Sequence, residues 1–446
     1  MSRILKESVR FNLFDFAFSA ISVVLLILSL GFYFWNNFSV TVSIISLIIT
    51  FIFVIKFKKN IPLFIMFAFF LMYNIAAVRY YLTNVDLAIW PDFQQKDIVN
   101  EVLIYNSLFI TALGSSIPSN INNKKIFLLD YSLKNYFVFF IFFIICILIF
   151  LFGISGDSLL DGGAYGSAEK STWNEYFIMF FLFLILSLPN YTFFYKSLLT
   201  TLALLYAIKN LLYGGRIEVL QFFLLIFYVF YVFNQKIKYK WFYLFLFVAL
   251  YFNEVTSAVR SSPMDFFSGN YWDYLNPLIF LKSDNSLGYL ASNQGDVLHS
   301  SARILGLIEN NVLGFWERIF SFLSYAYSPF VPAKFFPEYS NLALYKQDFY
   351  SSGGGGLIGV YFFAWLGFIG PVFVGLFIGY FIRCFYTKKS IYYKIYGATL
   401  LITFPRWYAY NPIFIVKFCF YSVFIFFMVS VFVKLIKPKN DSSNCI

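Results

Sequence analysis

Long runs of apolar residues recur along the whole chain, and they constrain its fold more than any other feature. Segments of about 20 residues with almost no charge are typical of membrane-spanning helices. Only 12% of the 446 residues are charged, against about 25% in soluble domains. Within lipid the backbone must satisfy its own hydrogen bonds, and these runs are too long and continuous for barrel strands. The sequence therefore predicts an all-α polytopic membrane protein.

The apolar pattern predicts about twelve transmembrane helices. We place them at residues 14–35, 38–55, 61–81, 99–116, 135–153, 173–189, 193–212, 217–233, 241–255, 355–382, 395–412 and 413–433. The predicted division is a membrane domain over 1–252, a large periplasmic loop over 253–353, a second membrane domain over 354–434 and a cytoplasmic tail over 435–446. The loop is too long and too rich in aromatic residues for a linker, so we expect an extracytoplasmic subdomain containing short helices.

Basic residues set the expected orientation. With the N-terminus in the cytoplasm, most of the 33 lysines and arginines fall in short cytoplasmic loops, as the positive-inside rule requires. Twelve spans also return the basic C-terminus to that side. The net charge of +11 thus comes from basic residues that keep these loops in the cytoplasm, and we expect no nucleic acid as partner. The arginines placed outside are Arg79, Arg216, Arg260, Arg303, Arg318 and Arg406. Guanidinium groups bind phosphate or carboxylate with two parallel hydrogen bonds, so we expect anion chemistry on the outer face.

One segment of the large loop combines helical spacing with polar chemistry. In "GDVLHSSARILGLIENN" (295–311) the side chains of Asp296, His299 and Arg303 would share one face of a helix. His299 is the only histidine of the chain. Beside an arginine it could act as a general base or bind an anion. The alternative is the exposed polar face of an amphipathic loop helix with an acidic cap.

A second arginine stands at a tight turn between two predicted spans. The motif "GGR" (214–216) brings Arg216 to the outer membrane end, and Glu218 follows it closely. A charge at membrane depth is costly and often functional. Arg216 is therefore a candidate for binding an anionic substrate, and Glu218 is a candidate base. The alternatives are snorkelling of the arginine to the interface or a structural pair with a nearby acid.

Two further arginines are candidates of the same kind. In "FPRWYAYNP" (404–412) two prolines bracket an interrupted helix that carries Arg406, and such interruptions usually line a cavity. Tyr408 could stack on a sugar face or belong to the interfacial aromatic belt. Arg260 lies just past a predicted span, and both a functional and a structural role remain open for it. Arg318 is expected to be structural.

The chain lacks the usual signatures of metal and cofactor enzymes. Its four cysteines are scattered, without a CxxC or CxxH pair. There is no Walker A motif, no HExxH and no GxSxG. We expect no metal and no cofactor.

A glycine run leads from the large loop into the next apolar span. "SSGGGGLIGVYFFAWLGFIG" (351–370) follows the large loop and contains Gly353, Gly354 and Gly355. With about twelve spans, a late outer loop and arginines at helix ends, this layout resembles the Wzy-type O-antigen and capsular polysaccharide polymerases. Many relatives carry an acidic residue just after the glycine run, where this chain reads "LIGVY". No carboxylate base stands at this place, which leaves His299 or Glu218 as the candidate base.

The resemblance implies a metal-independent glycosyltransferase of the bacterial inner membrane. The donor would be the growing glycan on undecaprenyl diphosphate, and the acceptor a single repeat unit on the same carrier. A departing diphosphate accumulates negative charge, which positioned arginines stabilise. Arg216, Arg260, Arg406, Tyr408 and the glycines would contact diphosphate or glycan, and His299, Arg303 or Glu218 would serve catalysis. A chain-length regulator protein is a further expected partner.

Three other interpretations remain open. An O-antigen ligase would use the same donor with lipid A core as acceptor. A lipid-linked oligosaccharide flippase would also have about twelve spans, although its loops are generally short and a two-fold repeat is expected. A scaffold without catalysis is the third. The glycine run itself has two interpretations: its amides bind the diphosphate, or its glycines allow close packing of the loop.

Overall fold

The computed structural model is almost entirely helical. It describes residues 12–35, 39–83, 86–87, 96–121, 133, 135–156, 169–188, 192–213, 215–232, 269 and 293–436. The chain forms two compact units. Unit 1 comprises Met1–Lys124, Pro277–Lys389 and Thr403–Lys417, and unit 2 comprises Lys125–Asn276, Ser390–Ile402 and Phe418–Ile446.

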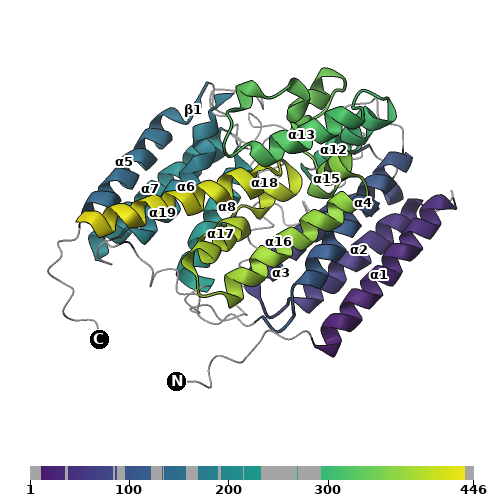
Figure 1. The fold of residues 1–446 in the computed structure, drawn as a ribbon, viewed down its shortest axis with the longest axis horizontal. Coiled ribbons are helices and arrows are strands. Elements are labelled where there is room, and N and C mark those ends of the chain that lie inside the picture. The colour runs from purple at the N-terminus through teal and green to yellow at the C-terminus, as the bar shows by residue number, and fades with distance from the viewer. Residues whose placement is uncertain are drawn as a thin grey trace. The chain divides into compact units, whose positions relative to one another are not determined.

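Unit 1 is a bundle of long helices joined to several short ones. The long helices are α1 (Leu13–Phe34), α2 (Ser39–Lys56), α3 (Ile61–Thr83), α4 (Lys96–Ser116), α12 (Asn293–Glu309), α13 (Phe315–Tyr327) and α16 (Ile369–Thr387). The short elements are η6 (Ala333–Phe335), η7 (Glu338–Ser340), α14 (Leu342–Tyr345), η8 (Lys346–Asp348), α15 (Ile358–Leu366), α18 (Phe404–Ala409) and the π-helical turn η9 (Phe414–Phe418). Helices α1, α2 and α4 run side by side, and α16 packs along α4 (Figure 1). A Cβ atom at Gly375 would lie 2.7 Å from the Phe109 carbonyl oxygen, so this glycine permits the close approach of α16 to α4.

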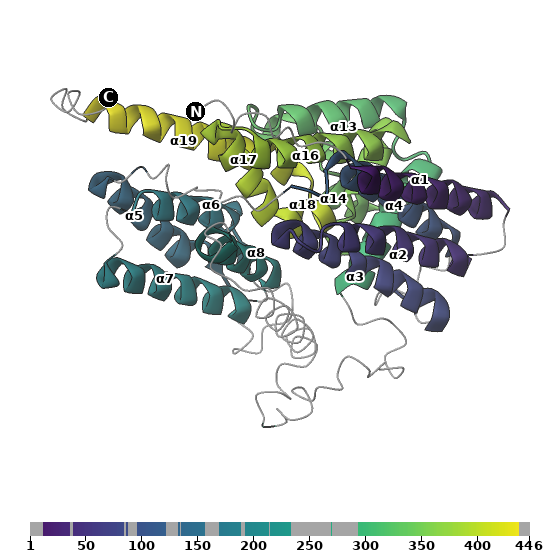
Figure 2. The same ribbon diagram turned by 90° about the horizontal axis from the view of Figure 1, so that it is seen from below.

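Unit 2 contains the remaining helices. They are α5 (Tyr136–Phe152), α6 (Thr172–Leu186), α7 (Phe193–Leu212), α8 (Arg216–Phe227) with the π-helical turn η3 (Tyr228–Val232), α17 (Ile391–Ile402) and α19 (Cys419–Ile436). Helix α5 packs along α6, and α7 packs against α8 (Figure 2). Asn135 caps α5, because its side-chain oxygen accepts from the amides of Phe137 and Val138. Two short strands, β1 (Ile154–Ser155) and β2 (Glu169–Lys170), pair antiparallel.

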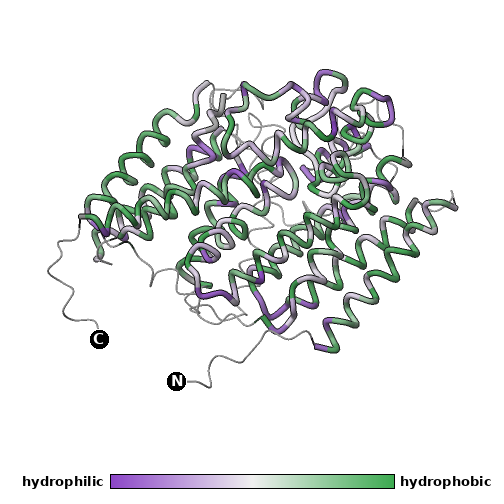
Figure 3. Tube along the Cα trace, viewed as in Figure 1, coloured by the Kyte–Doolittle hydropathy of each residue, from purple (hydrophilic) through white to green (hydrophobic). Residues whose placement is uncertain are grey.

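The helices have the surface of a membrane protein. Among the described residues, five segments are long and apolar enough to cross a membrane: Leu13–Phe34, Ile61–Leu82, Ile98–Ser116, Ile369–Thr387 and Phe414–Leu435. Side chains such as Phe14 and Phe34 on α1 are 72% and 76% exposed, and α1 and α5 are mostly hydrophobic along their lengths (Figure 3). Water would penalise such faces, whereas lipid would not. The fold therefore supports a helical, multi-pass membrane protein, and the count of twelve spans stays a prediction.

The expected single helix over 355–382 is wrong, because the structure divides it. Helix α15 ends at Leu366, and Gly367 follows with a φ of 65° that a helix cannot continue through. Helix α16 begins at Ile369. The interruption expected within 395–412 is confirmed, since α17 and α18 are separate helices. The predicted span 241–255 lies outside the described residues.

The large loop does not stand apart from the membrane helices. Helix α12 packs against α3, α4 and α15 within unit 1. His299, Ser300 and Ser301 on this helix are at most 1% exposed. The exposed polar face considered for this segment is therefore not formed. The described part of the loop is built into unit 1, while the division at 253 and 353 stays a prediction.

A buried ion pair fastens three helices of unit 1. The Lys56 ammonium lies 3.4 Å from Asp15 Oδ1, and neither side chain is exposed. Lys56 also donates to the Gly114 carbonyl at 2.9 Å. The carboxylate accepts from the amides of Ser119 and Asn12, at 2.7 and 2.9 Å. Because each charge has several hydrogen bonds, the pair links α1 to α2 and α4 without leaving an unsatisfied ion.

Removing one partner of this pair should destabilise the protein strongly. We expect Lys56→Met to lower the free energy of unfolding by about 3–5 kcal/mol, because the Asp15 carboxylate would remain buried without its cation. The double variant Asp15→Asn, Lys56→Met should lose less unfolding free energy than Lys56→Met alone. Unfolding in mixed micelles measures both, with Lys58→Met as the exposed control. Equal losses in Lys56→Met and Lys58→Met would contradict the assignment.

Candidate functional site

The glycine run lies where three segments of unit 1 meet. Residues 353–356 connect η8 to α15. Ser300 Oγ on α12 donates to the carbonyl of the first glycine at 3.0 Å. The amide of the last glycine donates to the Ala409 carbonyl at 3.2 Å. The following amide, of Leu357, donates to Ser301 Oγ at 2.8 Å. The run is therefore fixed between α12 on one side and the end of α18 on the other.

The run's backbone favours the close-packing interpretation. Gly355 has a φ of 123°, which side chains with a Cβ rarely adopt, and an added Cβ would lie 3.1 Å from the Ala409 oxygen and the Tyr410 Cα. At Gly354 the nearest atom, Gln347 Nε2, is 4.0 Å away. Since the amides of Gly356 and Leu357 are already bonded within the protein, they do not form an open anion nest.

A buried lysine holds the run from η8. Lys346 has no exposed surface, and its ammonium donates to the Gly355 carbonyl. Burial lowers the pKa of Lys346 to about 7. No feature of the sequence singles out this lysine, because it stands alone in a polar stretch and acquires its environment only through tertiary packing.

His299 and Arg303 lie on the same helix beside this lysine. Burial lowers the pKa of His299 to about 3, helped by the positive charges of Arg303 and Lys346. The imidazole is therefore neutral at pH 7. The Arg303 guanidinium carbon lies 5.1 Å from the centroid of the Tyr350 ring, and the Tyr350 hydroxyl accepts from Asn310 at 2.6 Å. The predicted pairing of His299 with a neighbouring cation is thus present, although on a buried face.

Arg406 reaches the same region through its neighbour Tyr410. Its guanidinium carbon lies 5.5 Å from the Tyr410 ring centroid. The Tyr410 carbonyl accepts from the Tyr361 hydroxyl at 2.9 Å. The Tyr410 hydroxyl accepts from the Asn293 side chain at the start of α12. With Pro405 in its first turn, α18 is a short helix that ends beside the glycine run. Arg406, Arg303 and His299 are thus carried by elements that all contact this run.

Two other predicted residues have structural surroundings. Tyr408 has no exposed surface, accepts from Asn106 at 3.0 Å and stacks on Phe70 at 3.8 Å. This packing leaves no ring face for a sugar or for the interfacial belt. Arg318 donates to the carbonyls of Phe363 and Ala364 at the end of α15, which confirms its expected structural role.

Arg216 and Glu218 belong to unit 2. Arg216 is the first residue of α8, and Glu218 in the same turn is only 3% exposed. A polar cluster surrounds this turn: a Cβ at Gly215 would lie 3.1 Å from Glu218 Oε2 and 2.9 Å from Asn210 Oδ1. Asn210 in turn accepts from Asn174 at 2.9 Å. A buried carboxyl in a polar cluster is compatible with a base and equally with a structural pair.

Two of the predicted positions, Gly214 and Arg260, lie outside the described residues. Over the described ranges, no group of three or more His, Cys, Asp or Glu side chains could hold a metal ion.

Comparison of the chain with protein-family models, with curated proteins and with solved structures finds no match. The chemistry of the glycine run and its cations therefore has to support any functional conclusion.

The contrast between two glycines gives a first test of the run. We expect Gly355→Ala to lower the free energy of unfolding by about 1–3 kcal/mol, because its φ and the Ala409 carbonyl both oppose a side chain. Gly354→Ala, which has space, should change it by less than about 0.5 kcal/mol. Micelle unfolding compares the two. Equal tolerance at both positions would contradict the described packing.

The buried imidazole predicts acid sensitivity. The unfolded chain protonates His299 near its usual pKa of 6.5, whereas the folded chain does so only near 3. Between these values the unfolded state binds more protons, so stability falls as the pH drops through this window. We expect a loss on the order of a few kcal/mol by pH 3.

The matched variant is His299→Leu, which has no group to protonate. Its unfolding free energy should fall less steeply than that of the unmodified protein between pH 6.5 and 3. Parallel profiles would show that the acid sensitivity arises elsewhere.

Proposed function

We propose that the protein polymerises undecaprenyl-diphosphate-linked oligosaccharide repeat units at the outer leaflet of the bacterial inner membrane, to make O-antigen or a related surface polysaccharide. The observation that carries this proposal is that Arg303 and Arg406 stand on two helices, α12 and α18, that come from distant segments and both hydrogen-bond to one glycine run within a helical membrane protein. Cations held in a low-dielectric site suit a lipid-borne anion more than they suit a neutral substrate.

The proposed reaction is a glycosyl transfer between two lipid carriers. A hydroxyl of the acceptor repeat unit attacks the anomeric carbon of the donor glycan. The bond from that carbon to the diphosphate oxygen breaks, and the electron pair stays on the diphosphate. Arg303 and Arg406 would stabilise this developing charge, as guanidinium groups do for phosphoryl oxygens. The proton of the attacking hydroxyl passes to a base.

His299 and Glu218 remain the candidate bases. The His299 ring is neutral at pH 7, so it can accept a hydrogen bond from a hydroxyl, but its low pKa makes it a weak proton acceptor. Glu218 is buried in unit 2. A transition state with a strongly polarised leaving group needs little help from a base, which is consistent with an arginine-dominated site.

Arginine substitution tests the anion site. We expect Arg406→Ala and Arg303→Ala each to reduce long-chain surface glycan roughly 100-fold, the usual scale for losing one transition-state donor. Arg406→Lys should recover only part of it, because an ammonium lacks the planar fork. Arg216→Ala extends the test to unit 2. The measurement is a gel of surface glycan from cells, with membrane levels of each variant determined by immunoblot.

The control is Arg383→Ala. This arginine also lies over an aromatic ring, at 5.9 Å from the Tyr380 centroid, but it belongs to a predicted cytoplasmic loop. Cells with this variant should show the normal ladder of surface-glycan bands on the gel. Full ladders in all the alanine variants would exclude the anion site.

Deletion of the gene separates the alternatives. A polymerase deletion leaves single repeat units on the lipid A core and removes the ladder. Loss of the single unit as well would indicate a ligase or a flippase. If a chain-length regulator acts with this protein, deleting that regulator should change the ladder's length distribution without removing it.

A further inference from the structure

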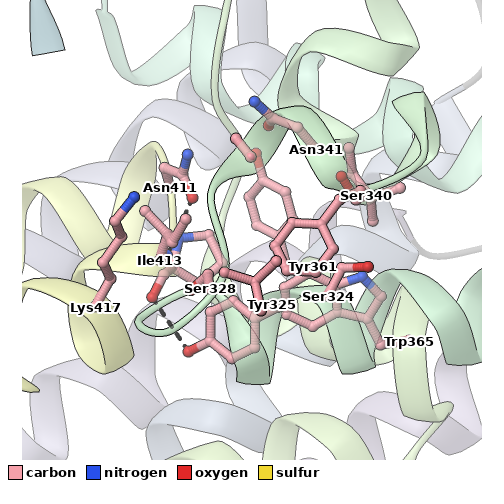
Figure 4. Close-up of a pocket in the computed structure, with 15 residues that line it drawn as sticks. Ser324, Tyr325, Ser328, Ser340, Asn341, Tyr361, Trp365, Asn411, Ile413 and Lys417 are labelled. Carbon is pink, nitrogen blue, oxygen red and sulfur yellow. Dashed lines mark hydrogen bonds between the residues drawn. The ribbon is translucent and has the colours of Figure 1, made fainter.

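A small pocket opens in unit 1 (Figure 4). Its volume is about 90 Å³. Side chains from α13, from α15 and from the segment 411–417 line it. The proposed chemistry at the arginines does not use this pocket.

Three aromatic side chains form a rigid part of its wall. Tyr325 and Trp365 lie with ring centroids 4.7 Å apart. The Trp365 indole donates to Ser321 at 2.8 Å, and the Tyr325 hydroxyl donates to the Pro412 carbonyl at 3.2 Å. The third ring, Tyr361, is held by its hydrogen bond to the Tyr410 carbonyl. The polar tip of each of these three rings is therefore bonded within the protein.

Polar groups are placed among the rings. Ser328 is 5% exposed, and its hydroxyl has no hydrogen-bond partner among the described residues. A buried hydroxyl of this kind is unfavourable unless something forms a hydrogen bond with it. Ser328 lines the pocket, together with Asn341, Asn411 and Lys417. A ligand that brings its own hydroxyl groups would satisfy them.

Tyr361 links the pocket to the surroundings of Arg406. Its side chain lines the pocket, and its hydroxyl donates to the carbonyl of Tyr410 at 2.9 Å. Asn411 directly follows Tyr410, whose ring lies beside Arg406. A molecule bound with an anionic group at Arg406 would therefore have its adjoining part close to the pocket.

We propose that this pocket binds the hydroxyl-bearing edge of one pyranose ring of a glycan. Aromatic faces combined with hydroxyl and amide groups match a sugar, which has apolar C–H faces and polar edges. A volume of about 90 Å³ is well below the roughly 300–1,000 Å³ of pockets that enclose a drug-sized ligand, which suits one ring edge and not an oligosaccharide. That this glycan is the lipid-linked substrate rests on the proposed function.

The single charged lining residue sets a preference. Lys417 is a cation, so a uronic acid or a neutral sugar should bind better than an amino sugar with a free ammonium group. The probes are methyl glucoside, methyl glucuronoside and methyl glucosaminide at millimolar concentration. The full chain is placed in nanodiscs, and binding is detected by saturation-transfer difference NMR.

The matched variants are Ser328→Val and Ser29→Val. Ser29 on α1 is also a buried serine without a described hydrogen-bond partner, 1% exposed, and it does not line the pocket. Both substitutions add the same volume. We expect at least a fivefold loss of the glucoside and glucuronoside signals in Ser328→Val, and unchanged signals in Ser29→Val. Absence of signal from all three glycosides overturns the proposal, as does equal signal in both variants.

This binding experiment is independent of polymerisation. Glycoside signals that depend on Ser328, with a normal ladder in Arg406→Ala cells, would uphold the sugar pocket and exclude the proposed diphosphate chemistry. Loss of the ladder in Arg406→Ala cells, with no glycoside signal from the unmodified protein, would uphold the diphosphate chemistry and exclude the sugar pocket.

Discussion

A helix end buried among apolar side chains must find its hydrogen-bond partners within the protein, and this requirement organises unit 1. Helix α15 is short and begins at the fully buried residues Leu357 and Ile358, so the backbone groups of its first turn have no bulk water to bond. Ser301 supplies an acceptor at its start, and Arg318 supplies donors at its end. Both come from the segment expected to be a separate loop. That segment therefore completes the membrane bundle as part of its core.

The same requirement explains the chemistry around the glycine run. An interrupted backbone exposes carbonyl groups, and Lys346 satisfies one of them at the cost of burying an amine. Burial of His299 itself lowers the pKa of its imidazole, and the nearby charges of Arg303 and Lys346 lower it further. A region with such perturbed groups is a candidate functional site on physical grounds. Structural burial and the proposed anion binding thus arise from the same residues.

Local patterns predicted the helices well, and tertiary relations only in part. The span at 193–212 coincides with α7, because its apolar run is bounded on both sides by residues that end a helix. The break at Gly367 was missed, since a glycine within an apolar run does not reveal its φ. Tyr408 was expected near a substrate or an interface, yet stacking on Phe70 encloses it. Lys346 could not be found from the sequence, because its importance depends on contacts that spacing along the chain does not encode.

The double attachment of α15 has a consequence for how such a protein can be recombined. Ser301 precedes the short helix by many residues and Arg318 lies between them in sequence, yet both bond to its backbone. The outer segment and α15 therefore have to be inherited together. A chimera that exchanged the segment 293–348 alone would combine the residues at positions 301 and 318 of one protein with the α15 helix of another. An exchange that includes the residues up to 366 would transfer Ser301 and Arg318 together with α15. The natural unit of exchange therefore crosses the boundary between the loop and the membrane helices.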